Sequence, residues 1–356
     1  MVVFICEDVI KALDKAEHVN HEHACRIFNE LSSAALRGKH FVLIENFLNA
    51  KIQNIIKRYI ADNCFMCLYK SNTAQSLAIL DMVSVVMVVS FHKINSDTLK
   101  RRYNNQKLLH LNPSRDTGIE LNVETRLLTE NHRDMKLFEA ITRRYMKKLK
   151  MSKQLDLRIH SISGGGFTIS EAYDEEKNRN AHLCITIVDS DKNYPDGEEG
   201  ATATELRTHI DDNWKFSDHH IMSELSEIEN LLPVSFYENK SNKPLIKLLS
   251  KFDLSFYDLK CGLTAGSLKN EGCYAHWSKI GIGLPSISDI RKQPNDKQIV
   301  KGIGNQAIPT FLKRKNYQAD IMGIKDEDLS ASQKNEYSAI SNLIFNWCVS
   351  STPARL

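Results

Sequence analysis

The chain of 356 residues has 42% hydrophobic and 26% charged residues, which is the composition of an ordinary globular protein and excludes a fibrous or disordered one. Its length suggests two domains or three small ones. The formal net charge is only +3, which excludes a global polycation, so any binding of nucleic acid must come from local basic clusters.

The cysteines and the apolar segments indicate where the protein acts. The eight cysteines are scattered without the spacing of a disulfide framework, which is typical of reduced thiols and predicts a cytoplasmic protein. The N-terminus has no basic segment before its short apolar stretch, so we expect no export signal. The most apolar stretch, residues 82–90, is too short to span a bilayer, and we expect no membrane among the partners.

The first part of the chain alternates between helical and strand-like patterns. Residues 1 to about 38 show apolar residues at helical spacing, with Gly38 in the place of a helix end. The elements expected after it are strand 40–45, helix 49–63, strand 64–69, helix 73–81 and strand 83–91. This alternation predicts an N-terminal α/β region of unknown role over residues 1–115. A polar segment rich in Asn, Pro, Ser and Gly marks the expected domain boundary at its end.

The middle of the chain, residues 116–235, has the pattern of a parallel sheet. The elements expected are strand 120–130, amphipathic helix 133–150, strand 155–162 with three glycines after it, helix 167–180 and buried strand 182–189. Consecutive crossovers of this kind make the strands parallel and the connections right-handed. A long loop over 192–218, a short strand and a helix or turn over 219–233 complete this part, and residues 236–356 are mainly helical by pattern.

Two acidic residues follow the buried strand directly. Strand periodicity places Asp189 and Asp191 on the same side of the chain. Ligands of an open parallel sheet bind at the carboxyl ends of its strands, and two carboxylates there are most easily kept ionised by a divalent cation. For this pair alone, a helix N-cap followed by a solvated loop is an equally good interpretation.

The order of these motifs resembles the TOPRIM fold, which is shared by type IA and type II topoisomerases, DnaG-type primases and the OLD (overcoming lysogenization defect) family nucleases. The segment LLTENHRDMKLFEAI is similar to the first TOPRIM motif, with Glu130 as the catalytic acid, Asp134 as the following Asp, and Asn131 in place of the usual Gly. SISGGG is similar to the glycine turn, IVDSD to the DxD motif, and SELSEIENLLP to an acidic element of OLD-like members. The resemblance covers about residues 120–235.

The resemblance implies a set of site residues. The catalytic residues would be Glu130, Asp189 and Asp191. The ligands of Mg²⁺ or Mn²⁺ would be Glu130, Asp134, Asp189, Asp191, Glu227 and Glu229. The nucleic acid would be bound by the glycine turn and by a basic helix, through Gly165, Arg143, Arg144, Lys147 and Lys148. The chemistry agrees, because a nuclease uses metal ions to activate water and to stabilise the leaving oxyanion, and Mg²⁺ prefers carboxylate ligands.

Several alternatives remain open in the sequence. Glu45, in HFVLIENFLNAKIQNII, also follows an apolar strand, but as the first-strand acid it would need a long insertion before the second strand. His132 lies next to Glu130 and could contact phosphate or only solvent. The basic segments 100–107 and 313–315 could hold a nucleic-acid backbone or form solvated surfaces.

The sequence therefore predicts a Mg²⁺-dependent TOPRIM nuclease that cleaves DNA or RNA, a toxic effector in antiviral (phage) defence controlled by a partner. OLD proteins carry an ATPase with their TOPRIM domain, whereas this sequence has no G-x-x-x-x-G-K-[ST] motif. A relative of this kind would act alone or with a separate ATPase or sensor subunit, and an oligomer is possible. The alternative function is a non-catalytic subunit that binds nucleic acid or a partner through a degenerate TOPRIM core.

Overall fold

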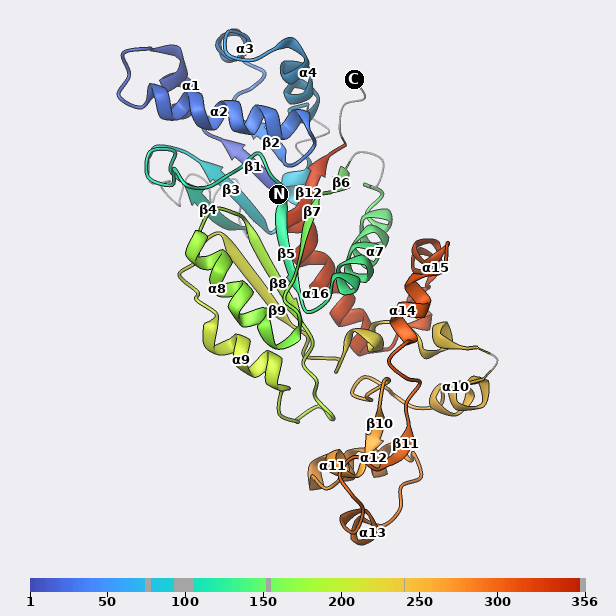
Figure 1. Ribbon diagram of the computed structural model, residues 1–356. Helices are drawn as coiled ribbons and strands as arrows, with labels where there is room; N and C mark the ends of the chain where they lie inside the picture. The colour runs from blue at the N-terminus through green and yellow to red at the C-terminus, as the bar shows by residue number, and fades with distance from the viewer. Residues whose placement is uncertain (74–77, 93–105, 152–154, 240, 353–356) are drawn as a thin grey trace.

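A computed structural model of the chain describes residues 1–73, 78–92, 106–151, 155–239 and 241–352. Two four-stranded parallel sheets, each flanked by helices, form its centre (Figure 1). The protein is thus of the predicted α/β class, with a mainly helical C-terminal region. A continuous hydrophobic core extends from the first sheet through the second into that C-terminal region.

The first sheet belongs to the N-terminal region and has the order β2-β1-β3-β4, with all neighbours parallel. Every residue of its first three strands is buried, as expected for strands covered by helices on both faces. The strands are β1 (Val2–Ile5), β2 (Phe41–Ile44), β3 (Val85–Val89) and β4 (Lys107–Leu111). The helices are α1 (Glu7–Asp14), α2 (His21–Leu36), α3 (Ala50–Lys57) and α4 (Asp62–Ser71), with a 3₁₀ turn η1 (Ala78–Asp81).

Some local predictions for this region are wrong. Residues 2–5 form β1 instead of the start of a helix, and residues 64–69 lie in helix α4 instead of a strand. Short apolar runs do not distinguish the two states by periodicity. In α4, Phe65 and Leu68 are buried on one face, whereas Met66 and Tyr69 are exposed. Strand β4 was not predicted, and residues 74–77 of the expected helix and most of the basic segment 100–107 lie outside the described residues.

The second sheet, in the middle of the chain, has the order β7-β5-β8-β9 and is parallel throughout, as predicted. Its strands are β5 (Thr125–Thr129), β7 (Ile159–Ser163), β8 (Cys184–Val188) and β9 (Ser217–Ile221). The connections contain α7 (His132–Lys148), η2 (Gly166–Thr168), α8 (Ile169–Arg179), α9 (Ala201–His209) and η3 (Ile228–Leu231). The loop expected over 192–218 is wrong in part, because α9 begins after the turn residues end at Gly200.

The C-terminal region divides into two parts. The helix α16 (Ala331–Cys348) packs on α7, and the strand β12 (Val349–Ser351) pairs antiparallel with β6 (Leu155–Leu157), so the end of the chain completes the central core. The strands β10 (Gly262–Thr264) and β11 (Gln298–Lys301) form an antiparallel ribbon. The remaining elements are η4 (Val234–Tyr237), α10 (Lys243–Leu249), α11 (Ala265–Leu268), α12 (Glu271–Ile280), α13 (Ile287–Arg291), α14 (Ala307–Leu312), α15 (Tyr317–Gly323) and η5 (Asp326–Asp328).

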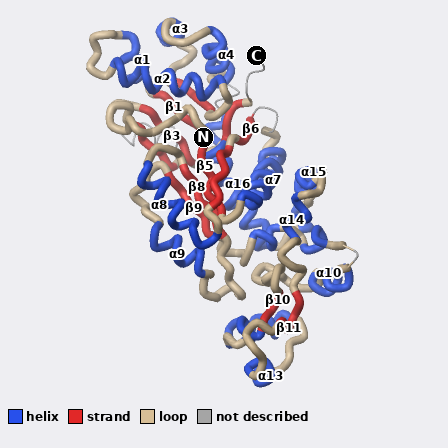
Figure 2. Tube along the Cα trace, in the orientation of Figure 1, coloured by secondary structure: helices blue, strands red, loops and turns tan. Residues whose placement is uncertain are grey.

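The ribbon and the helices α11 to α13 form a small unit, residues 256–304, which we call the ribbon module. It projects from the main body on the side where the strands of the second sheet end, at the bottom of Figures 1 and 2. The N-terminal sheet and its helices lie at the opposite end of the molecule. The ribbon module therefore lies on the side of the molecule that the carboxyl edge of the second sheet faces.

A buried glutamate ties α16 to the end of β9. Glu336 is 1% exposed, and its carboxylate accepts hydrogen bonds from the backbone amides of Ser223 and Glu224 at 2.7 and 2.8 Å. It also pairs with Nε2 of His220 at 2.6 Å. These three contacts join the last long helix to the chain that leaves the second sheet.

Replacing Glu336 by glutamine is expected to lower the free energy of unfolding by about 2–4 kcal/mol, because an amide is a weaker acceptor and cannot satisfy all three groups. Urea unfolding measures this change. The matched control is Glu327→Gln, because Glu327 is 73% exposed and pairs only with Lys325. The control should stay within about 0.5 kcal/mol of wild type. An equally small effect of the Glu336 change would contradict the role given to its carboxylate.

Candidate functional site

Two acidic residues meet where the neighbouring strands β5 and β8 end. Glu130 follows the last residue of β5 and Asp189 follows the last residue of β8. The strands are parallel and adjacent, so both side chains leave the sheet at the same edge. The amide of Asp189 lies 3.4 Å from Oε1 of Glu130, which it approaches as a hydrogen-bond donor. The structure thus brings together the two acids that the sequence placed at strand ends.

Asp191 reaches the same edge by a different route from the one predicted. It has a φ of 53°, in the left-handed region, so strand periodicity does not extend to it. Between the two acids, Ser190 is buried and donates from Oγ to the carbonyl of Leu225 at 2.8 Å. Gly200, which caps the start of α9, packs directly on Asp191: a Cβ at position 200 would lie 2.5 Å from the Asp191 side chain. This close approach requires glycine and places Asp191 at the positive end of the α9 dipole.

The turn η3 brings two more carboxylates to the edge. Glu227 and Glu229 are only 8% and 5% exposed. The ammonium group of Lys260, from the ribbon module, lies 3.1 Å from Oε1 of Glu227 and 3.6 Å from Oε2 of Glu229. Within the described residues, Oε2 of Glu227 is buried and has neither a hydrogen-bond partner nor an ion pair, and Oε2 of Glu229 has only the ammonium of Lys260. A buried carboxylate oxygen without a partner is costly and has free capacity for a cation.

Asn230 fixes the turn and the chain that carries Lys260. Its Oδ1 accepts from the amide of Glu227 at 2.9 Å, and its Nδ2 donates to the carbonyls of Leu254 and Tyr257 at 2.7 and 2.9 Å. The carbonyl of Lys260 in turn accepts from the amide of Gly304 at 3.1 Å. Lys260 is therefore held from both sides. Sequence reasoning assigned it no chemistry, and its only signal was a polar pair with Asp258 in an otherwise ordinary segment.

Asp134 flanks the site but already has a structural role. Its carboxylate accepts from the amide of Asn131 at 2.8 Å, and its own amide donates to the carbonyl of Asn131 at 3.0 Å, which together cap the start of α7. Asn131 has a φ of −131°, an ordinary extended value. The usual glycine of the TOPRIM motif is therefore not needed at this position for the backbone to turn into the helix.

The carboxyl groups at this edge disfavour one another's ionisation. Burial, followed by the charge of Asp191, raises the pKa of Glu130 to about 7, although the amide of Asp189 and the ammonium of Lys260 oppose the rise. Burial also raises the pKa of Glu227 to about 8, against the effect of Lys260. Burial and then Glu130 and Asp134 hold the pKa of Asp189 well above its usual range. Such a cluster becomes fully ionised most easily when a cation joins it.

The metal-free protein is therefore expected to lose stability as the pH rises from about 5 to about 7. The pKa of Glu130 is about 7, that of Asp134 about 7 and that of Glu227 about 8, all above their values in an unfolded chain. A raised pKa of an acid contributes stability that is complete below the unfolded value and is lost progressively as the pH rises from that value to the folded one. The buried His40 and the buried amino group of Met1, whose pKa is lowered to about 5, act in the opposite sense, but three carboxyl groups outweigh them in this window.

Thermal unfolding in EDTA at about pH 5, 6 and 7 measures this change, with a parallel series in about 10 mM MgCl₂. We expect Tm to fall with pH in EDTA and to fall much less with Mg²⁺, which would compensate the ionised carboxylates. A Tm that rises across this window in EDTA would contradict the assignment of a shared acidic cluster.

The donor set suits Mg²⁺ or Mn²⁺, but the ligands are not yet assembled around one point. Among the described residues, no group of three or more His, Cys, Asp or Glu side chains is placed so that it could hold a metal ion as it stands. The structure therefore does not show the six predicted ligands as a formed metal centre. Instead, Lys260 supplies the positive charge at Glu227 and Glu229. The buried Oε2 of Glu227, which has no partner among the described residues, and the hard carboxylate donors fit the metal chemically.

The basic residues predicted to bind nucleic acid lie away from the acidic edge. They occupy the last turns of α7, a helix that begins beside Glu130, which puts them about 20 Å along its axis. Arg144 is buried and binds the carbonyl of Ile324 and the carboxylate of Asp326, and Lys148 pairs with the same Asp326. Arg143 pairs with Glu139 and Asp156, and Lys147 is exposed. These arginines hold α7 to its neighbours, and their place does not suit binding at the site.

The other predicted residues also have definite places. Gly165 has a φ of +68° and donates its amide to the carbonyl of Glu130 at 3.0 Å, so the glycine turn supports the catalytic candidate directly. His132 is exposed and lies 3.0 Å from Oγ of Ser161 through Nδ1. Glu45 follows β2 in the first sheet and accepts from the amide of Glu7 at 2.9 Å. Since Asp189 follows a strand of the second sheet, Glu130 and not Glu45 is its neighbour.

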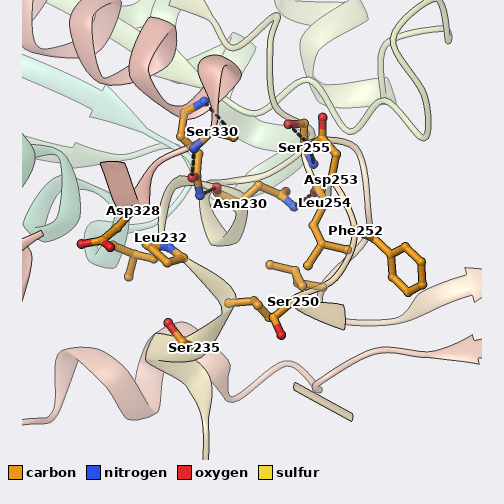
Figure 3. A pocket seen from close by; sticks show the side chains of 14 residues that line it. Asn230, Leu232, Ser235, Ser250, Phe252, Asp253, Leu254, Ser255, Asp328 and Ser330 are labelled. Carbon is orange, nitrogen blue, oxygen red and sulfur yellow. Dashed lines mark hydrogen bonds between the residues drawn. The ribbon is translucent and has the colours of Figure 1, made fainter. Parts of the chain in front are cut away.

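Two pockets lie beside the turn that carries Glu227 and Glu229. The pocket in Figure 3, of about 280 Å³, is lined by Asn230, Leu232, Phe252 and Asp328 among others. Asp253 and Ser255 line this pocket and also a second one of about 320 Å³, which extends to His276. Neither pocket is lined by a lysine or an arginine of the described residues.

Comparisons with protein-family models, curated proteins and solved structures found no match. In the part of the chain that the structure describes, no helix is long and apolar enough to cross a membrane. All eight cysteines are free thiols. The function must therefore be argued from the acidic edge itself.

Proposed function

We propose that the protein is a metal-dependent nuclease with a TOPRIM-like centre that hydrolyses phosphodiester bonds. The observation that supports this most is the meeting of Glu130 and Asp189 at the ends of adjacent parallel strands, with Asp191, Glu227 and Glu229 beside them. Mutually repelling carboxylates at the carboxyl edge of a parallel sheet are suited to a divalent cation and to a phosphate bound through it.

The residues would divide the work of the reaction. Glu130, Asp189 and Asp191, with Glu227 and Glu229, would hold Mg²⁺ or Mn²⁺, and Asp134 would stay mainly a helix cap. When bound, the metal activates water and stabilises the leaving oxyanion. The ammonium of Lys260 is the nearest cation to the cluster and would bind a phosphate oxygen.

The setting of the activity rests on the resemblance to OLD-like TOPRIM proteins. We infer a toxic effector in antiviral (phage) defence that acts in the cytoplasm, under the control of a separate ATPase or sensor subunit. Fold analogy is a weak guide to biological role, so the chemistry is the part to test first.

The experiment is cleavage of plasmid DNA, single-stranded DNA and total tRNA by purified wild-type and Asp189→Ala proteins, each with Mg²⁺, Mn²⁺ or EDTA. We expect cutting of one substrate class with metal, none in EDTA and none by the variant. The substrate that is cut decides between DNA and RNA. Absence of cutting in every condition, also with candidate partner subunits present, would overturn the proposal.

One observation favours a second function, that of a non-catalytic binding subunit. Lys260 already neutralises Glu227 and Glu229, and no metal ligand group is formed among the described residues. A non-catalytic subunit would bind nucleic acid with the same affinity in EDTA as with Mg²⁺. Its affinity for Mn²⁺ would be no higher than that of the Asp189→Ala variant. Titration with Mn²⁺ followed by electron paramagnetic resonance distinguishes the two functions without any assay of cleavage.

A further inference from the structure

The ribbon module, residues 256–304, lies against the acidic edge and is anchored to it at two places. Lys260 enters the cluster from the start of the module. On the other side, Nε1 of Trp277 donates to the carbonyl of Asn193 at 2.9 Å, in the loop that follows Asp191. The module projects beyond the main body at this edge (Figure 1). Any long substrate that reaches the acidic site must therefore pass close to the module.

The module and the edge it borders have opposite charge. Residues 189–230 contain twelve Asp and Glu and only three Lys and Arg, whereas residues 256–304 contain seven Lys and Arg and four Asp and Glu. An acidic site by itself repels a polyanion over a range of about 10 Å in about 0.1 M salt, and over a longer range in more dilute salt. A neighbouring basic surface would compensate this repulsion and raise the local concentration of a polyanion.

Three lysines of the module are exposed and make no ion pair with any described residue: Lys279, Lys297 and Lys301. The other cations of the module are engaged. Arg291 pairs with Glu271, Lys292 pairs with Asp289, and Lys269 donates to the carbonyl of Gln293. Lys301 pairs across the ribbon with Gly262, and Gly262 is two residues after Lys260 in the chain. Lys301 at the end of β11 and Lys297 just before its start are therefore available on the strand that pairs with the segment following Lys260.

We propose that the ribbon module binds the phosphate backbone of the nucleic acid, with Lys297 and Lys301 contacting phosphates next to the one bound at Lys260. This inference rests on the proposed function for the class of substrate, but it requires binding only and no cleavage. The surface that binds the nucleic-acid backbone is then on the ribbon and not at the end of α7, where the arginines are already paired.

The test is fluorescence anisotropy with labelled 20-nucleotide single-stranded DNA, duplex DNA and single-stranded RNA in EDTA, at several salt concentrations. The variant is Lys297→Gln/Lys301→Gln in the full chain. Its matched control is Lys15→Gln/Lys51→Gln, which removes the same charge from exposed positions of the N-terminal region. Circular dichroism and Tm confirm that both variants are folded.

We expect the ribbon variant to bind about 10-fold or more weakly than wild type at low salt. The slope of log Kd against log salt should fall by roughly two, because each phosphate contact contributes about 0.7–0.9 to it. The control should match wild type in both quantities. Equal weakening of both variants, an unchanged Kd of the ribbon variant, or no binding by wild type would overturn the inference. Binding by wild type without any cleavage in metal would leave it standing and overturn only the nuclease.

Discussion

Replacing Asp189 by asparagine is expected to lower the rate of metal-dependent cleavage at least about 100-fold. Asp189 lies at the centre of the cluster, where burial and then the charges of Glu130 and Asp134 raise its pKa well above the usual range. The amide has the same shape but cannot supply the negative charge that a divalent cation needs. Replacing a residue that only hydrogen-bonds to a metal ligand lowers metal affinity or activity by about 10–100-fold, so replacing a direct ligand should lower it further.

The same variant should be at least as stable as wild type in EDTA at pH 8. An ionised carboxylate among other carboxylates is unfavourable, and a neutral isostere relieves the repulsion. Loss of cleavage with retained stability would separate a role in chemistry from a role in folding. The control is Asp212→Asn, an exposed carboxylate of the same acidic segment, which should cut like wild type. Cleavage by Asp189→Asn at the wild-type rate would contradict the proposed site.

Replacing Lys260 by methionine is expected to lower the free energy of unfolding by about 3–5 kcal/mol at pH 8 in EDTA, because the change leaves two buried carboxylates without their cation. Lys260 lies 3.1 Å from Glu227 and 3.6 Å from Glu229, and both glutamates are less than 10% exposed. Addition of Mg²⁺ should restore part of the loss, since the metal would replace the ammonium as the counter-charge. Urea unfolding with and without Mg²⁺ measures both effects.

A triple variant provides the control for this prediction. In Glu227→Gln/Glu229→Gln/Lys260→Met the carboxylates are neutral, so removing the lysine no longer leaves unpaired charge, and most of the stability should return. A single Lys260→Met protein that stays within 1 kcal/mol of wild type would show that the ion pairs at 3.1 and 3.6 Å do not stabilise the fold.

Part of the acidic site could be predicted because it depends on local sequence. The run HLCITIV is apolar, β-branched and bounded by charge, so a buried strand ending at Asp189 is the natural interpretation, and β8 is that strand. Glu130 also follows directly on a strand. Parallel strands all end at one edge, so the two acids were expected to meet once the alternation of strands and helices was recognised.

Local sequence was less reliable where a segment is short or similar to another. The run CFMCLY has no periodicity long enough to separate helix from strand, and the contacts of Phe65 and Leu68 in the core of the first sheet decide for a helix. Glu45 and Glu130 have similar neighbours along the chain. Only the sheet to which each preceding strand belongs distinguishes them.

The sequence by itself determined the α/β class, the parallel order of the strand and helix pattern, and the acids at two strand ends, because each depends on periodicity within a few residues. The tertiary structure alone decided that Lys260 joins these acids and that Asn230 holds it there, because these contacts link segments distant along the chain. It also decided that the basic end of α7 points away from the site. The two ends of α7 lie far apart along the helix axis, and one of them lies beside the acidic site. The sequence shows that the basic residues are clustered, but not whether the end that carries them lies near the site.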